Sequence, residues 1–406
     1  MVDLYDAKWI FLMSLAIAVV LTLIYVKFLD WFAFWLAWIS VAVIQLAFIL
    51  LGWFMWEVRS DFVSDTNTSN DKYTKYLLWA TIASWVLALG WYIFIACNFR
   101  SLKVSIAIIE TAADWFADTK RIILVPMAFF GLGILMLVAW IVSLAGVSSL
   151  GEISVDSVQH QGKNVEWDQK TEIMIYFMCF GAFWLAAFLI TCNEFVVIVS
   201  TCTWYFSRKD IPDDDGIPGD SEVYKGFWWA IRYHMGSIAF GSFILAIVWV
   251  IQSAFEYVGN KVEKASGNNG CVKCLLGGVR CCLDCFDRFV RFLNRNAYIY
   301  QAISNENFCS SAVNAFILVL KNSAKFTFVH TIGSVFMIIA KVCIAIVTTV
   351  ICYFVMKDIL SNQFPYVPLA VIFLCSYGVA SVFISVFEVS ANTILQCYLI
   401  DLDISK

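Results

Sequence analysis

Long apolar runs constrain this chain more than any other feature of its sequence. A helix of about twenty residues crosses the hydrocarbon core of a bilayer, and eight windows of that length or more follow one another. They cover residues 9–29, 31–56, 76–98, 122–147, 173–206, 236–257, 332–356 and 366–392. Charged residues make up only 14% of the chain, against about 25% in a soluble domain. The sequence therefore predicts an integral membrane protein that crosses the bilayer many times.

The composition favours helices over a membrane barrel. Five prolines and twenty glycines in 406 residues suit long, uninterrupted helices, and the windows lack the strict alternation of barrel strands. We predict an all-α fold, a polytopic integral membrane helical bundle forming one transporter-like domain over residues 1–406. It would hold 8–9 transmembrane helices plus amphipathic or re-entrant helices, the ninth span coming from residues 285–320. Only Asp30 separates the first two windows, which predicts a tight antiparallel hairpin.

Three segments between the windows carry distinct patterns. Residues 99–121 combine basic residues with apolar ones at helical spacing, which predicts an amphipathic cytosolic connector on the membrane surface. Residues 207–231 contain an acidic run between prolines and predict a polar cytosolic loop. Residues 259–330 form an amphipathic region rich in Cys and Asn. If the spans alternate strictly, this region begins outside the cell. Its basic residues favour the cytosolic side instead, so the sequence does not decide on which side of the membrane the region lies.

Polar side chains within the apolar windows are candidate functional residues. Burying an unpaired charge in hydrocarbon is costly, so such residues face partners or a pathway. Glu194 lies ten residues from both Trp184 and Trp204, which places the three on a similar helix face. Glu388 and Asn392 share a face of the last window because they are four residues apart. Two interpretations remain: a Lys341–glutamate pair that joins helices, or a substrate or proton site containing a carboxylate.

Histidines and cysteines give weaker signals. Of the three histidines, two fall in predicted loops, and His234 fits either a buried residue at a helix start or a proton-linked role. A cluster with two Cys-x-x-Cys spacings permits free or acylated thiols, a zinc site or disulfides. Its members are Cys271, Cys274, Cys281, Cys282 and Cys285.

Motifs of the common enzyme classes are missing from the sequence. The chain has no HExxH motif, no glycine-rich phosphate loop after a strand, and no nucleophile–base pair that could be assembled from its residues. We therefore expect no enzymatic activity, no catalytic residues, no metal, no cofactor and no nucleic-acid partner. The lipid bilayer is the expected surrounding.

A stretch of unusual polarity carries a family resemblance. Residues 292–299 read FLNRNAYI and are followed by NFC at 307–309 and NAF at 314–316, while residues 232–241 read RYHMGSIAFG. Together with short SVF and DLD stretches near the C-terminus, these segments resemble the choline transporter-like family over residues 9–403. The asparagines of the stretch suit either a broken or re-entrant helix or a cytosolic helical hairpin.

The resemblance implies about ten spans and sodium-independent uptake of choline or a related organic cation, with proton exchange. The implied substrate-binding residues are Trp184, Glu194, Trp204, Glu388, Asn392, Asn294 and Asn296. Trp and Tyr rings with a carboxylate suit a quaternary ammonium, which has no N–H donors. Where this chain has Glu194, Glu388 and Asn392, the family tends to have Gln, a small residue and Asp, respectively. The charged residues within the bundle therefore stand at different positions in this chain.

Two functions from different classes fit these observations. The first is a carrier for choline or a related cation that works by alternating access, possibly proton-coupled. The second is a non-transporting accessory subunit of a membrane assembly, in which case other membrane subunits are partners. The family's first span and large external loop have no counterpart here, which indicates a shortened chain or a divergent member. The plasma membrane is the expected location, with an organellar membrane, including the mitochondrial one, as the alternative.

Overall fold

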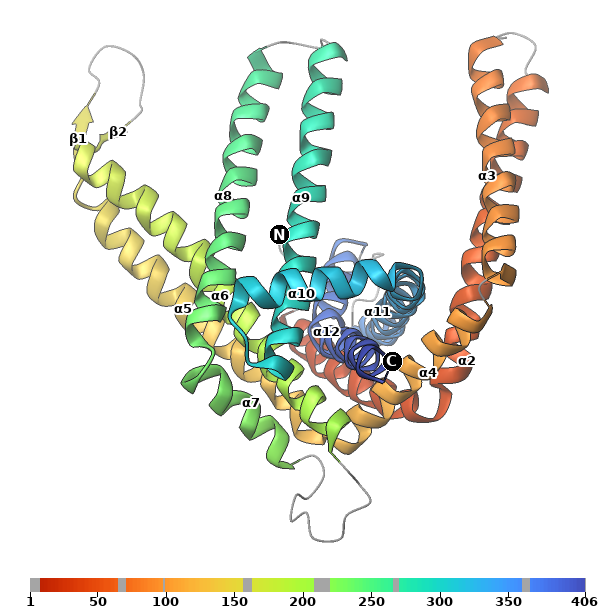
Figure 1. The fold of residues 1–406 in the computed structure, drawn as a ribbon. Helices are drawn as coiled ribbons and strands as arrows, with labels where there is room; N and C mark the ends of the chain where they lie inside the picture. Colours follow the sequence, from red (N-terminus) through yellow and green to blue (C-terminus); the bar gives the residue numbers. More distant parts are fainter. Residues whose placement is uncertain are drawn as a thin grey trace. The chain divides into compact units, whose positions relative to one another are not determined.

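The chain folds almost entirely into helices, which form two compact units (Figure 1). The computed structural model describes residues 8–64, 71–97, 99–155, 163–207, 220–265, 270–359 and 366–405. Unit 1 combines Met1–Asp118 with Val319–Lys406, and unit 2 is Thr119–Leu318. Each unit is described by itself below. A single transporter-like domain over the whole chain stays a prediction.

Unit 1 is built from the first three helices and the last two. The helices are α2 (Lys8–Ser64), α3 (Asp71–Cys97), α4 (Phe99–Asp118), α11 (Ser323–Ile359) and α12 (Tyr366–Ile404). The two C-terminal helices pack against each other, and both also contact α2 and α4. Large apolar side chains fill the contacts, as where the Phe336 ring of α11 lies 5.9 Å from the Phe387 ring of α12.

The predicted hairpin at Asp30 is wrong, because α2 continues through this residue as one helix. One charged residue does not stop a helix, and α2 contains no proline and a single glycine, Gly52. The helix still carries two apolar parts, a shorter one at Met13–Tyr25 and a candidate span at Val41–Asp61. Near its start, Phe11 and Ile17 pack on a cluster of α11 and α12 side chains. Its second part pairs with α3.

Helix α4 is buried in protein along its apolar face. Leu102, Ile109 and Trp115 have no exposed surface, and the helix contacts α2, α11 and α12. The sequence predicted a helix lying on the membrane surface at 99–121. Apolar residues at helical spacing fit a protein surface as well as a lipid surface, so the spacing alone could not distinguish the two.

In unit 2, the other helices pack around α6. Its elements are η1 (Lys120–Ile123), α5 (Leu124–Ser148), β1 (Glu152–Val155), β2 (Lys163–Glu166), α6 (Gln169–Phe206), α7 (Asp220–Arg232), α8 (Met235–Ala265), α9 (Gly270–Ser304) and the start of α10 (Phe308–Lys321). Helix α6 packs against α5, α7, α8 and α9. Helix α9 packs against α8, and Figure 1 shows the two side by side.

Two segments of unit 2 differ from the expected pattern. The strands β1 and β2 form an antiparallel pair in which Glu152 is opposite Glu166, a small exception to an all-α fold. In the predicted loop 207–231, residues 208–219 lie outside the described residues, but Asp220–Arg232 is helix α7. This helix packs closely on α6, since a Cβ added at Gly226 would lie 2.8 Å from the Val196 carbonyl oxygen.

The polar signature stretch contains a helix break, as its asparagines indicated. Helix α9 ends at Ser304, and α10 begins at Phe308. Asn305 has a φ of 56°, and its N–H donates to the Gln301 carbonyl oxygen over 2.9 Å. Asparagine adopts this left-handed backbone more readily than most residues, which suits a helix C-terminus. The break separates α9 from α10.

The predicted fold class, a polytopic helical membrane bundle, is confirmed. Among the described residues, seven helices are long and apolar enough to cross a membrane. The expected first window corresponds to the shorter apolar part of α2, and the possible ninth span falls on α9 and α10. The seven segments are Val41–Asp61, Thr74–Cys97, Lys120–Ser148, Gln169–Phe206, Met235–Ala265, Lys325–Met356 and Val367–Ile404.

Candidate functional site

The seven predicted site residues are divided between the two units. Glu388 and Asn392 belong to α12 of unit 1, whereas Trp184, Glu194, Trp204, Asn294 and Asn296 belong to α6 and α9 of unit 2.

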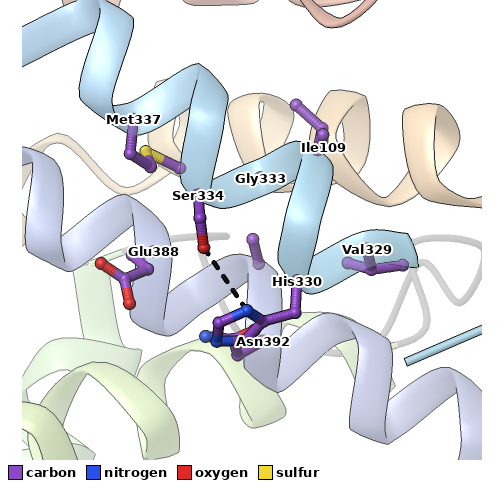
Figure 2. A pocket seen from close by; sticks show the side chains of 9 residues that line it. Ile109, Val329, His330, Gly333, Ser334, Met337, Glu388 and Asn392 are labelled. Atoms are coloured by element: carbon purple, nitrogen blue, oxygen red, sulfur yellow. Dashed lines mark hydrogen bonds between the residues drawn. The ribbon is translucent and has the colours of Figure 1, made fainter. Parts of the chain in front are cut away.

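In unit 1, Glu388 and Asn392 line a small pocket between α4, α11 and α12. Figure 2 shows them one turn apart on α12, with His330 and Ser334 on α11. Ser334 Oγ lies 3.4 Å from His330 Nδ1. The other lining residues are Ile109, Val329, Gly333, Met337 and Ala391. The pocket thus brings a carboxylate, an amide, an imidazole and a hydroxyl to one place.

The space inside this pocket is small. It offers about 10 Å³ to the centre of a water molecule, which is room for about one water. A trimethylammonium group, with four carbons around its nitrogen, needs far more space. A substrate of that size could enter only after the surrounding side chains or helices had moved apart.

His330, Ser334 and Ile109 were not predicted as site residues. The sequence placed His330 in a loop because the apolar window starts at residue 332, whereas α11 already begins at Ser323. The spacing of His330, Ser334 and Met337 is i, i+4 and i+7, which is the signal that could have placed them on one helix face. Ile109 could not be found from sequence, because its contribution depends on how α4 packs.

In unit 2, Glu194 forms an ion pair with Arg295. Arg295 Nη2 donates to Glu194 Oε1 over 2.8 Å, and both side chains are about three-quarters buried. The pair joins the middle of α6 to the signature stretch of α9. The sequence suggested Lys341 as a partner for either glutamate, but for Glu194 the partner is Arg295. The positive charge of Arg295 therefore balances the negative charge of Glu194 within unit 2.

The two signature asparagines make local hydrogen bonds. Asn294 Nδ2 donates to the Gly241 carbonyl oxygen of α8 over 3.0 Å. Asn296 Nδ2 donates to the Phe292 carbonyl oxygen of its own helix over 2.7 Å. Both side chains are buried. The Asn294 bond connects α9 to α8, whereas the Asn296 bond stays within α9.

The two tryptophans lie far apart along α6. Trp184 is 38% exposed, and its Nε1 donates to the Ala239 carbonyl oxygen over 3.2 Å. Trp204 is buried at 8% exposure. Twenty residues of helix separate them, or about 30 Å at a rise of about 1.5 Å per residue. A single small cation could therefore contact only one of them at a time.

His234 is buried in unit 2, just before α8 begins. Its ring centroid lies 5.2 Å from that of Phe195, and only 6% of the residue is exposed. Burial lowers the pKa of His234 below its ordinary value, because the charged imidazolium loses its hydration. The imidazole is therefore neutral over a wider pH range than in water.

The cysteine cluster supplies free thiols in the part of the chain that the structure describes. Cys274, Cys281, Cys282 and Cys285 are unpaired and exposed on α9, while the Cys271 side chain lies outside the described residues. No group of three or more described His, Cys, Asp or Glu residues is placed to hold a metal ion.

The apolar helices and the polar residues between them define an integral, multi-pass helical membrane protein. Residues 82–403 match the family model described as plasma-membrane choline transporter. This match covers most of the chain, and the chain belongs to that family.

Curated relatives agree with this assignment. Choline transporter-like protein 2 of Xenopus laevis is 33% identical over 241 residues, 57% of this chain and 33% of the relative. Choline transporter-like protein 2 of Dictyostelium discoideum is 28% identical over 394 residues, 94% of this chain and 61% of the relative. Choline transporter-like protein 1 of Mus musculus is 26% identical over 304 residues, 74% of this chain and 45% of the relative. The matched parts thus cover 33–61% of the length of these relatives.

Proposed function

We propose that this protein carries choline or a related small organic cation across a membrane. Membership of the choline transporter family supports the substrate class and favours transport over the accessory-subunit alternative. The observation that carries the proposal is the unit 1 pocket, where Glu388 and Asn392 meet His330. A carrier of this kind needs no cofactor and performs no chemical reaction. The family description makes the plasma membrane the proposed location.

The pocket chemistry suits a cation that cannot donate hydrogen bonds. A quaternary ammonium is attracted by negative charge and by aromatic faces. The Glu388 carboxylate would supply the charge, and the Asn392 amide oxygen would add a dipole. The His330 ring, which lies 6.2 Å from the Phe326 ring in a stacked arrangement, would offer a flat surface.

The small size of the pocket supports alternating access. Because the pocket has room for about one water, a choline-sized cation does not fit in it in this conformation. Binding would then require a conformation in which α4, α11 and α12 separate, and release would require another. Proton exchange, which the family resemblance implies, is part of this proposal.

In unit 2, a cation would have to compete with Arg295 for Glu194. The guanidinium already occupies one carboxylate oxygen over 2.8 Å. A contact with substrate would therefore accompany a separation of α6 and α9. The same two helices carry four further proposed substrate contacts, Trp184, Trp204, Asn294 and Asn296. We propose that the substrate contacts them one after another along its path rather than all at once.

Uptake of labelled choline into proteoliposomes tests the role of the pocket. Glu388→Gln removes the negative charge and keeps the shape, so we expect uptake to fall by about tenfold or more, as for a lost charged contact of about 1.5–3 kcal/mol. Glu110→Gln is the matched control, because Glu110 is exposed on α4 beside the pocket residue Ile109. Equal uptake by Glu388→Gln and the control, from equally well-folded protein, would contradict this role.

A further inference from the structure

A groove in unit 2 lies between α7 and the start of α5, and it is much roomier than the unit 1 pocket. It offers about 290 Å³ to the centres of water molecules, against about 10 Å³ in the unit 1 pocket. Most of its lining is apolar, and the residues concerned are Leu124, Val125, Ala128, Val223 and Phe227. The groove therefore suits an apolar group rather than a hydrated solute.

The two polar residues of the lining are Arg121 and Tyr224. Arg121 lies one turn before Leu124, so the guanidinium stands at one end of the lined face of the helix. The rim is open, since Leu124 is 62% exposed and Tyr224 is 71% exposed, whereas Val125 and Val223 are buried beneath them. The groove thus combines an apolar floor with a positive charge at one end.

Contacts within unit 2 hold the two walls together. The Phe129 ring of α5 stacks on the Phe227 ring of α7, with the ring centroids 5.7 Å apart. Helix α7 also lies close to α6, where Gly226 meets the Val196 carbonyl oxygen, and α6 packs against α5 as well. Every residue of the groove and of these contacts belongs to unit 2.

The groove lies at the end of a candidate membrane span. The span Lys120–Ser148 begins with two basic residues, and residues 122–151 contain no charged residue. This run is longer than the about twenty residues that cross the hydrocarbon core. Because lipid headgroups lie at the ends of spans, Lys120 and Arg121 are expected at headgroup level, with the groove extending from them toward the hydrocarbon.

The exposed face of α7 has the composition of a membrane interface. Tyr224, Trp228 and Ile231 are all exposed, and their spacing of i, i+4 and i+7 places them on one face of the helix. Tyrosine and tryptophan are enriched where a membrane meets water. Helix α7 therefore gives a second reason, independent of α5, to place this groove beside lipid headgroups.

Basic side chains gather around the groove. Lys120, Arg121 and Lys225 are exposed, and Lys225 directly follows the lining residue Tyr224. Asp118 is the nearest exposed acidic residue in sequence before Lys120, while the side chains of Asp220 and Glu222 lie outside the described residues. Basic residues near the ends of spans attract anionic lipid headgroups.

We propose that this groove binds an anionic phospholipid. One acyl chain occupies the apolar groove, and the headgroup phosphate contacts Arg121 together with Lys120 or Lys225. The apolar lining recognises the chain, and the positive charge distinguishes an anionic lipid from a neutral one. This inference does not depend on choline being the substrate, so it can fail while the proposed transport function holds, and the reverse.

Binding of two lipids to the purified full chain tests the proposal. The probes are phosphatidylglycerol and diacylglycerol with the same oleoyl chains, and native mass spectrometry in detergent gives the dissociation constant for the first lipid bound. Neither probe contains an ammonium group, so neither resembles the proposed transport substrate. We expect the unaltered protein to bind phosphatidylglycerol at least about tenfold more tightly, because the basic side chains contact only the phosphate.

Two variants with matched controls test the two halves of the site. Arg121→Gln removes the charge that lines the groove, and its control is Arg288→Gln, at an exposed arginine on α9. Ala128→Trp fills the groove from its exposed rim. Its control is Ala139→Trp, at an exposed position three turns further along the same face of α5.

We expect Arg121→Gln and Ala128→Trp each to weaken binding of phosphatidylglycerol by at least about fivefold, through loss of charge and loss of apolar burial. The two controls should bind as the unaltered protein does. Either variant binding as tightly as its control would overturn the proposal, and so would equal weakening in all four. Equal affinity of the unaltered protein for the two lipids would overturn it without any variant having to fold.

Discussion

At the scale of single residues, the Glu194–Arg295 pair connects two helices through one charged hydrogen bond. Removing only Arg295 would leave a carboxylate in a partly buried position, so we expect Arg295→Gln to destabilise the protein by about 1–3 kcal/mol. The double variant Glu194→Gln with Arg295→Gln should regain part of this loss, because neither charge is then left alone. Thermal unfolding in detergent measures both effects.

Arg291 provides the comparison for this prediction. It pairs with Asp287 within one helix turn, and about half of its side chain is exposed. Pairs of this kind contribute about 0.2–0.5 kcal/mol, so Arg291→Gln should change the unfolding temperature much less than Arg295→Gln. If the two substitutions lower the unfolding temperature equally, the pair between helices contributes no more to stability than the pair within one helix.

His234 should make stability depend on pH. Its pKa in the folded protein is lowered by burial, so the unfolded chain binds a proton more readily than the folded one. Stability from the neutral imidazole is fully present above the unfolded pKa of about 6.5 and is lost as the pH falls through the folded pKa. We therefore expect the unfolding temperature to fall between about pH 7.5 and 5.5.

The variant His234→Gln isolates this contribution. It removes the titrating group and keeps a polar side chain, so its unfolding temperature should change less over the same pH range. Parallel pH profiles for the variant and the unaltered protein would assign the pH dependence to other groups.

Single site residues were predictable from sequence only in part. Glu388 and Asn392 were predicted as site residues because polar residues in an apolar window are expensive to bury, and both line the unit 1 pocket. His330 was missed because the window began two residues after it, although the helix extends further. For Glu194, the partner could not be found, since Arg295 is 101 residues away in sequence and meets it only through folding.

At the scale of elements, the contact between α8 and α9 depends on Gly241. A Cβ at this position would collide with the Tyr298 hydroxyl and lie 3.1 Å from Phe308 Cε2. We expect Gly241→Ala to destabilise the protein by about 1–3 kcal/mol through overpacking. Gly236→Ala on the same helix is the control, because a Cβ there meets nothing within 4 Å.

A second substitution separates crowding from other effects of Gly241→Ala. The Tyr298 hydroxyl has no hydrogen-bond partner among the described residues, so Tyr298→Phe should by itself be tolerated. Combined with Gly241→Ala, it removes the atom nearest to the new methyl group and should restore much of the unfolding temperature. If the unfolding temperature of the double variant is no higher than that of Gly241→Ala, the strain does not come from contact with the Tyr298 hydroxyl.

Most elements were predictable because apolar windows and helices coincide. The corrections have local physical causes: α2 lacks a helix-stopping residue at Asp30, and α4 buries its apolar face against protein rather than lipid. Helix α7 was taken for a loop because its charged residues obscure a buried face that contains Val223 and Ala230. In each case the structure depends on which elements pack together, and a single sequence does not show which elements these are.

At the scale of the whole molecule, the chain belongs to the choline transporter family, and transport of choline or a related cation is our proposal for it. The sequence predicted the class of protein from its apolar windows and the family from its signature stretch. It named seven candidate substrate-binding residues, of which two belong to unit 1 and five to unit 2.

The central claim is that the chain transports choline or a related cation. The most direct measurement is uptake of labelled choline into proteoliposomes containing the purified protein, at two external pH values. We predict saturable uptake that is faster when the liposome interior is more acidic than the outside, because protons leaving the liposome would then drive entry of the cation. No uptake at either pH value from well-folded protein would contradict the account.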